Sequence, residues 1–306
     1  MLVTHFLFVL YERKQYMIKL IASDMDGTLL DANMQIPEKN VTAIKYAQSQ
    51  GVEFMVATGR NRLEALPSLT EAGIECAMIT LNGAQVFNKE GNSMFMESID
   101  LETAEKVLDF LEKEDIYCEI STNKGTFSQS KERRIENFAT MVAEAMPHLT
   151  HKVAIAMSTA RLEYLPIQFV DSIREVMRRD DITVLKIICF HRDGAAFLGP
   201  AARMIDENFT NLFVTSSGQN NLEINHRLAQ KGIAVGHIAK ERGINLDEVM
   251  TIGDNLNDVS MIQSTGVSFA MGNGLPEVKE YAKYITDTNV AAGVGQAIYR
   301  AIKENL

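Results

Sequence analysis

The stretch that decides the fold is Lys19-Leu20-Ile21-Ala22-Ser23, followed at once by Asp24-Met25-Asp26-Gly27-Thr28. The first part predicts a buried β-strand, and the acidic second part predicts the turn at which that strand ends. In open α/β sheets, ligands bind outside the carboxyl ends of the strands. Two carboxylates two residues apart can both face such a site where the chain turns, and Gly27 allows a close approach of the backbone. Taken alone, the pentapeptide also fits a plain acidic turn or the start of a helix.

Short apolar runs and helix-like stretches alternate after this segment. Residues 52–57 predict a second strand and residues 77–80 a third, with a helical stretch before each. This βαβαβ order is typical of a parallel sheet covered by helices. The same rhythm returns after Gly199-Pro200. There we expect a helix from 231 to 243 and strands at 211–215, 248–252, 266–271 and 284–286.

Residues 98–198 have a different pattern, because they mix strand-like and helical segments after a hairpin turn predicted at 88–91. We therefore predict an α/β fold with a doubly wound, Rossmann-like parallel-sheet core formed by residues 17–97 and 199–306. Residues 98–198 form an inserted α+β cap domain in this prediction. Residues 1–16 are expected to be an N-terminal extension before a natural start at Met17, since their apolar run is too short to cross a bilayer.

The composition excludes several classes of protein. The chain has 306 residues, of which 46% are hydrophobic and 23% charged, which is typical of a soluble globular protein. Acidic residues outnumber basic ones 40 to 30, and the net charge of −10 argues against nucleic acid as a partner. The 3 cysteines form no CxxC pair, which indicates reduced thiols, no disulfide framework and a cytoplasmic location. We expect no membrane contact, and the formation of a homo-oligomer stays open.

Three further segments place polar groups at predicted strand ends or helix starts. Thr58-Gly59-Arg60 follows the second strand, and Lys231-Gly232 begins a helix, where the amine joins the positive end of the helix dipole. Gly253-Asp254-Asn255-Leu256-Asn257-Asp258 follows another strand and adds two carboxylates together with amides. Each segment alone has an ordinary explanation, such as a turn, a surface lysine or a polar loop. A calcium-binding EF-hand loop is excluded because no Glu stands at its twelfth position.

The order and placement of these motifs resemble the haloacid dehalogenase-like hydrolase superfamily, in particular its Cof-type branch with a type IIB cap. The similarity runs from about Met17 to the C-terminus and includes Asn82-Gly83-Ala84 and residues 267–273. The sequence departs from the branch in the loop before Lys231, where Arg227 stands near a position at which glycine is usual.

The resemblance implies a Mg²⁺-dependent phosphatase that acts on small phosphorylated metabolites through an aspartyl-phosphate. It makes Asp24 the nucleophile and Asp26 the general acid and base. The implied phosphate-binding groups are Met25, Thr58, Gly59, Lys231 and Asn257. The implied Mg²⁺ ligands are Asp24, the carbonyl of Asp26 and Asp254, with Asp258 in a supporting position. Physical chemistry agrees, because a carboxylate nucleophile beside a phosphate dianion needs a cation to offset the repulsion, and Mg²⁺ prefers oxygen ligands.

Two other functions stay compatible with the same motifs. A phosphomutase or phosphotransferase would use the same intermediate, and a metabolite-binding protein could keep the fold without catalysis. All the motif residues are present, which favours an enzyme over a binding protein. The sequence of the cap does not identify the substrate. Its candidates for contacts with the substrate are Lys124, Phe127, Arg133, Arg134 and Tyr164, although a surface or core role is the ordinary expectation for each.

Overall fold

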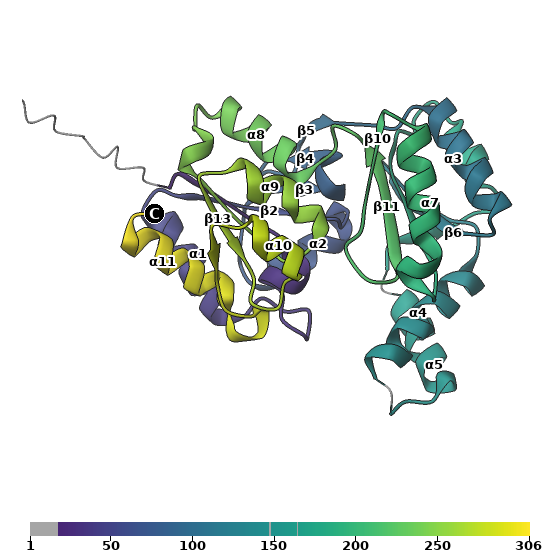
Figure 1. Cartoon of the computed structure of the whole chain (residues 1–306), viewed down its shortest axis with the longest axis horizontal. Coiled ribbons are helices and arrows are strands. Elements are labelled where there is room, and N and C mark those ends of the chain that lie inside the picture. The colour runs from purple at the N-terminus through teal and green to yellow at the C-terminus, as the bar shows by residue number, and fades with distance from the viewer. Residues whose placement is uncertain (1–17, 147, 164) are drawn as a thin grey trace, which may run out of the picture.

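The computed structural model describes residues 18–146, 148–163 and 165–306 (Figure 1). The extension predicted at 1–16, with Met17 and Tyr164, lies outside the described residues. Within those ranges the strands form two separate sheets, one with eight strands and one with six. Each sheet is the centre of one lobe, and the larger lobe contains the C-terminus (Figure 1).

The eight-stranded sheet is mostly parallel. Its strands follow in the order β14 (Tyr284–Ile285), β13 (Val267–Ala270), β12 (Val249–Gly253), β1 (Leu20–Ser23), β2 (Glu53–Ala57), β3 (Ala77–Thr80), β4 (Gln85–Phe87) and β5 (Ser93–Met96). The strands from β14 to β3 are parallel, and β4 and β5 add an antiparallel edge. Leu20 of β1 is paired with Val249 on one side and with Glu53 on the other, so the carboxyl ends of these three strands lie together.

Helices cover both faces of this sheet, because its central strands are apolar on both sides. The helices of this lobe are α1 (Glu38–Ser49), α2 (Arg62–Glu71), α8 (Lys231–Glu241), α9 (Val259–Ser264), α10 (Pro276–Tyr281) and α11 (Gly293–Glu304). Short 3₁₀ turns lie at Leu81–Gly83, Leu246–Glu248, Leu256–Asp258 and Asn289–Ala291. Ile21 packs with Ile44 of α1 on one face, whereas Leu20 and Ala22 pack with Val235 of α8 on the other. The doubly wound α/β core that the sequence predicts is therefore present.

The six-stranded sheet is largely antiparallel. Its order is β10 (Leu212–Thr215), β11 (Asn221–His226), β9 (Val184–Phe190), β6 (Tyr117–Thr122), β7 (Gly125–Ser128) and β8 (Ile167–Phe169). One face packs against α3 (Leu101–Lys113), α6 (Ile173–Met177) and α7 (Gly194–Asn208). The other face turns toward the larger lobe, since Lys186 Nζ donates to the Gly59 carbonyl at 2.8 Å. Two helices that pack on each other, α4 (Lys131–Ala145) and α5 (His151–Leu162), extend from one end of this lobe (Figure 1).

The structure corrects the point at which the chain returns to the larger sheet. We expected the return at residue 199, after Gly199-Pro200, with a core strand at 211–215. This prediction is wrong, because β10 and β11 join β9 in the six-stranded sheet and Gly199-Pro200 lies inside α7. The chain re-enters the larger lobe only at α8. The physical reason is that a short apolar run fits a strand of either sheet, and its pairing partner is decided by distant segments.

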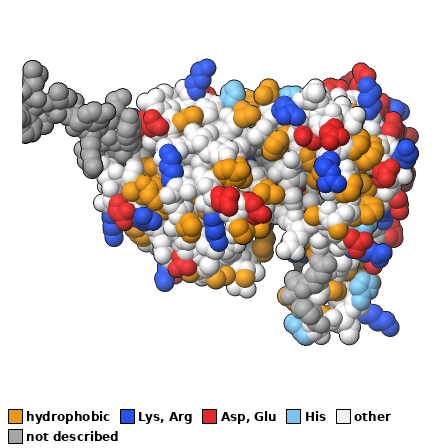
Figure 2. Space-filling model, viewed as in Figure 1, with side chains coloured by type: hydrophobic (Ala, Val, Ile, Leu, Met, Phe, Trp, Pro, Cys, Tyr) orange, Lys and Arg blue, Asp and Glu red, His pale blue; other side chains and the backbone are white. Residues whose placement is uncertain are grey.

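The surface is mixed in character. On the face shown in Figure 2, acidic and basic side chains are interspersed, and the hydrophobic ones form small separate groups. The net charge of −10 is therefore not gathered into one patch on that face. Among the described residues, no helix combines the length and the apolar character that a membrane crossing needs.

Candidate active site

Four segments that are far apart in the sequence meet at the carboxyl edge of the larger sheet. Asp24 follows β1, Thr58 follows β2, Asp254 follows β12, and Lys231 begins α8. Asp24, Thr58 and Lys231 are buried. Strands that run in the same direction end at the same edge of a sheet, and this topology brings the predicted groups together.

Lys231 links two of the acidic loops. Its Nζ donates to Asp24 Oδ1 and to Asp258 Oδ1, each at 2.6 Å, and its side chain is 0% exposed. Burial alone would lower the pKa of Lys231, but the carboxylates of Asp24 and Asp258 raise it above its ordinary value. The lysine therefore stays protonated and fixes the position of Asp24.

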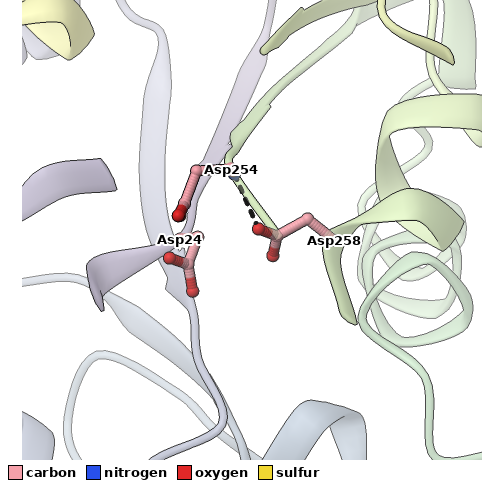
Figure 3. A group of neighbouring side chains, drawn as sticks. All are labelled: Asp24, Asp254 and Asp258. Atoms are coloured by element: carbon pink, nitrogen blue, oxygen red, sulfur yellow. Dashed lines mark hydrogen bonds between the residues drawn. The ribbon is translucent and has the colours of Figure 1, made fainter. Parts of the chain in front are cut away.

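Asp24, Asp254 and Asp258 form an acidic cluster, in which one carboxylate oxygen from each lies within 4.8 Å of the others (Figure 3). Asp258 Oδ2 also accepts from the backbone N–H of Asp254 at 2.9 Å. Burial, and then the charge of Asp258, raises the pKa of Asp254 to about 7. Burial and the same charge raise the pKa of Asp24. One lysine thus faces three crowded carboxylates, and such a set of oxygen ligands fits a hard divalent cation such as Mg²⁺.

Asp26 lies only two residues after Asp24, but its side chain does not join the acidic cluster. Its carboxylate pairs with Arg60, whose Nε lies 2.7 Å from Oδ2 and whose Nη2 lies 2.5 Å from Oδ1. The side chain of Asp26 is 45% exposed, and it lines the cavity described below. Arg60 belongs to the Thr58-Gly59-Arg60 segment, but we predicted no role for it. Such a two-bond pair holds a carboxylate firmly, and here it holds the carboxylate at the solvent side of the site.

The turn between the strand and the first helix depends on Gly27. Its φ is +76°, and a Cβ at this position would lie 2.5 Å from Asp254 Oδ2. Any side chain here would be strained and would also collide with the acidic cluster. The next residue, Thr28, donates to Asp254 Oδ1 at 2.7 Å. The turn therefore connects the two acidic loops directly.

The other predicted phosphate-binding groups have different surroundings. Thr58 Oγ1 accepts a backbone N–H at 3.2 Å. The Asn257 side chain donates to Asn82 Oδ1 at 3.1 Å and lines the cavity together with Gly59. The side chain of Met25 is fully buried in the core of the larger lobe, so only its backbone is suited to bind a ligand.

A cavity of about 490 Å³ lies beside these residues and between the two lobes. The larger lobe contributes Asp24 and Asp26 to its wall, and the smaller lobe contributes residues of β9, β11 and the α4–α5 pair. A hollow of about 1090 Å³ lies elsewhere on the larger lobe, and none of the predicted site residues lines it. The position of the cavity between sheet edge and cap makes it the candidate site.

The polar face of the smaller sheet was not among the features we predicted. Lys186 of β9 and Glu223 of β11 form an ion pair at 2.9 Å, with side chains 4% and 2% exposed. Asn82 of the larger lobe donates to Glu223 Oε2 at 2.6 Å. Burial would raise the pKa of Glu223, but Lys186 and these hydrogen bonds lower it. Strand alternation could have revealed this face, because Lys186 and Glu223 each precede a residue that packs in the core on the opposite side.

The cap residues that the sequence singled out lie in different environments. Arg134 is buried and lines the cavity. Arg133 pairs with Asp115 at 2.8 Å and is not among the described residues that line the cavity. Lys124 is exposed, and Phe127 is buried in the core of the smaller lobe.

Comparisons with known proteins agree with this arrangement. The sequence model of the haloacid dehalogenase-like hydrolase family matches residues 21–298. Phosphatase YwpJ of Bacillus subtilis (strain 168) is 31% identical over 285 residues, which cover 90% of this chain and 97% of that protein. The 5-amino-6-(5-phospho-D-ribitylamino)uracil phosphatase YcsE of the same strain is 28% identical over 289 residues, with 94% and 97% covered.

A solved structure gives the same result. A haloacid dehalogenase-like hydrolase from B. subtilis aligns with a TM-score of 0.82 and 30% identity, over 94% of this chain and 100% of that one. Both the motifs and the sheet edge at which they meet are thus explained by common descent. The predicted class of enzyme is confirmed, and this chain belongs to the haloacid dehalogenase-like hydrolase family.

Proposed function

We propose that the protein is a Mg²⁺-dependent phosphatase of small phosphorylated metabolites. The observation that carries this proposal is the buried lysine bridge, in which Lys231 Nζ holds Asp24 and Asp258 at 2.6 Å beside an open cavity. A fixed carboxylate beside a fixed cation suits attack on a phosphoryl group, because both are in place before charge develops.

In the first step, Asp24 attacks the phosphorus atom and the bond to the ester oxygen breaks. Lys231 binds Asp24 Oδ1, and Oδ2 has no hydrogen bond from any described residue, so Oδ2 is the attacking oxygen. Asp26 gives its proton to the departing alkoxide. The product of this step is an aspartyl-phosphate on Asp24 and a free alcohol.

In the second step, water attacks the phosphorus of the aspartyl-phosphate and passes its proton to Asp26. The bond between phosphorus and Asp24 Oδ2 breaks, and inorganic phosphate leaves. The pair with Arg60 holds the carboxylate of Asp26 in a fixed position from which it can accept this proton. The exposed position of Asp26 gives it access to both the leaving group and water. Thr58, Lys231, Asn257 and the backbone N–H groups of Met25 and Gly59 would hold the phosphoryl oxygens.

The metal site of this proposal consists of Asp24, the carbonyl of Asp26 and Asp254, supported by Asp258. The crowding of Asp24, Asp254 and Asp258 around one lysine supports it, because their negative charge exceeds what Lys231 balances. Bound there, Mg²⁺ would neutralise charge on the phosphate and orient it toward Asp24. A cytoplasmic location and the lack of nucleic-acid and membrane partners stay predictions. Whether the protein forms a homo-oligomer stays open.

The test is release of inorganic phosphate from a panel of sugar phosphates and related esters, with Mg²⁺ and with excess EDTA. We expect hydrolysis that needs Mg²⁺ and no bisphosphate activator. A requirement for such an activator would indicate a phosphomutase instead. Binding of esters without any turnover would indicate a binding protein, and full activity in EDTA would reject the metal site.

A further inference from the structure

The α4–α5 pair forms a wall of the cavity that differs from the rest of the site. It contributes Arg134, Phe138 and Arg161 to the lining. The guanidinium groups of both arginines lie over the ring of Phe138, at 4.6 Å for Arg134 and 4.7 Å for Arg161. One aromatic ring therefore holds two cations close together, next to the space where a substrate would lie.

Arg134 is buried yet incompletely bonded. It is 7% exposed, and its Nε lies 3.2 Å from Glu119 Oε1 in an ion pair. Its Nε and Nη1 nevertheless have no hydrogen-bond partner among the described residues. A buried polar atom without a partner is costly, so such groups in native proteins call for an explanation. Arg134 also lines the cavity, so an anion bound there would lie beside an incompletely bonded guanidinium group.

Arg161 forms no ion pair with any described residue, and the carboxylate of Asp26, which acts on it electrostatically, is already paired with Arg60. Burial and the nearby charges of Arg60 and Arg134 lower the pKa of Arg161. The other cations of the cavity wall each pair with a carboxylate, since Arg60 pairs with Asp26, Lys186 with Glu223 and Arg134 with Glu119. The α4–α5 wall therefore carries one more positive charge than its ion pairs balance, that of Arg161.

We propose that Arg134 and Arg161 bind a second anionic group of the substrate, so that the preferred substrates are phosphate esters with a further phosphate or carboxylate. This inference rests on the proposed function, which puts the reacting phosphate at Asp24. The cavity of about 490 Å³ holds a small metabolite that reaches from Asp24 to the α4–α5 wall.

Two pairs of esters test this inference and separate the two kinds of anion. Glucose 6-phosphate and 6-phosphogluconate differ by a carboxylate, and fructose 6-phosphate and fructose 1,6-bisphosphate differ by a phosphate. We would measure kcat/KM for each with the wild type, Arg161→Gln, Arg134→Gln and Arg133→Gln. Arg133 is the matched control, because it neighbours Arg134 on α4 but pairs with Asp115 outside the cavity. Arg161→Gln keeps the test valid if the buried Arg134→Gln variant fails to fold.

We expect the wild type to prefer the doubly anionic member of at least one pair by tenfold or more, as charge-assisted hydrogen bonds allow. Arg161→Gln should reduce that preference at least tenfold, whereas Arg133→Gln should keep it. Equal rates for both members of each pair, or a preference that survives in Arg161→Gln, would overturn the inference while leaving the phosphatase proposal intact.

Failure of the phosphatase proposal itself has a different signature, namely no hydrolysis of any ester. Calorimetric titration of the same four compounds in Mg²⁺ would still decide the second-anion site. Tighter binding of a doubly anionic compound by the wild type but not by Arg161→Gln supports it, and equal binding overturns it.

Discussion

The two walls of the cavity carry opposite excess charge. The wall formed by the larger sheet is backed by three crowded carboxylates around one lysine, and of these Asp24 lines the cavity while Asp254 and Asp258 lie behind it. The wall formed by α4 and α5 has Arg134 and Arg161, which the ring of Phe138 holds together. Each wall is incomplete in the absence of a ligand, but the first lacks a cation and the second lacks an anion.

We infer from this difference that one wall carries out the reaction and the other wall recognises the substrate. Groups on the sheet edge are positioned by strand ends and a helix start, and in the proposed function they act on the phosphoryl group of every ester. Groups on the α4–α5 wall can touch only the part of a substrate that lies beyond the phosphoryl group. Substitutions on the first wall should therefore lower the rate for all esters, and those on the second should change the ranking among esters.

The largest effect is expected from Asp24→Asn. An amide has almost the shape of the carboxylate but cannot act as the nucleophile, so turnover of every ester should fall to background. Phosphate release should be measured over the whole panel, and acid-quenched enzyme should be analysed by mass spectrometry for a covalent phosphate. Measurable turnover by Asp24→Asn, or an adduct on another residue, would show that the nucleophile is elsewhere.

Lys231→Met should have the next largest effect. It removes the cation aimed at the transferring oxygens, and loss of one such group lowers kcat by about 10²- to 10³-fold. Lys186→Met is the matched control, because Lys186 is also a buried lysine between the two lobes but contacts Glu223 and Gly59, not Asp24. We expect Lys186→Met to act mainly on KM, and circular dichroism would verify the folding of both variants. A decrease of less than tenfold in kcat for Lys231→Met would reject the role of this lysine.

The catalytic edge could be predicted from the sequence for a topological reason. Asp24, Thr58 and Asp254 each follow an apolar run, and parallel strands must end at one edge. The local sequence is therefore enough to predict that these three residues lie at one sheet edge, even when the order of the strands is not known. The pair between Asp26 and Arg60 was not predictable in this way, because it depends on the direction of two flexible side chains.

The cap was less predictable because its features depend on pairing between distant segments. The run at 211–215 is apolar enough for either sheet, and only its antiparallel pairing with β11 places it in the smaller lobe. Arg133 and Arg134 are adjacent and chemically identical, yet one is at the surface and the other buried. Helical rotation separates them, and the position of that helix relative to the cavity is set by tertiary packing.

Glu223→Gln should lower stability, because it leaves Lys186 buried without a carboxylate. Removing one partner of a buried ion pair typically costs about 3–5 kcal/mol, which corresponds to a decrease in Tm of about 6–20 °C. The pKa of Glu223 is lowered in the folded state, so its contribution is present above the ordinary carboxyl pKa and disappears as the pH falls. The effect should thus be larger at pH 7 than at pH 4. Glu102→Gln, which breaks the exposed pair with Lys106, is the control and should change Tm by less than about 2 °C.

Asp254→Asn should produce the smallest effect, and in the opposite direction. Burial and the charge of Asp258 raise the pKa of Asp254 to about 7, well above the ordinary value of an aspartate. The folded state therefore holds this proton more tightly than the unfolded state, and stability is lost as the pH rises toward 7. The neutral amide avoids this loss, and its oxygen can still accept the bond from Thr28. In EDTA, the variant should have a Tm a few degrees above the wild type at pH 8, and the difference should be smaller at pH 5. Mg²⁺ should reverse the order of the two Tm values at pH 8, because the cation offsets the crowded charge of the wild type but has one carboxylate fewer to bind in the variant.

A Tm of Asp254→Asn below that of the wild type in EDTA at pH 8 would contradict this prediction. It would mean that the sheet-edge wall carries no excess negative charge, so the two walls would not differ in the way described above.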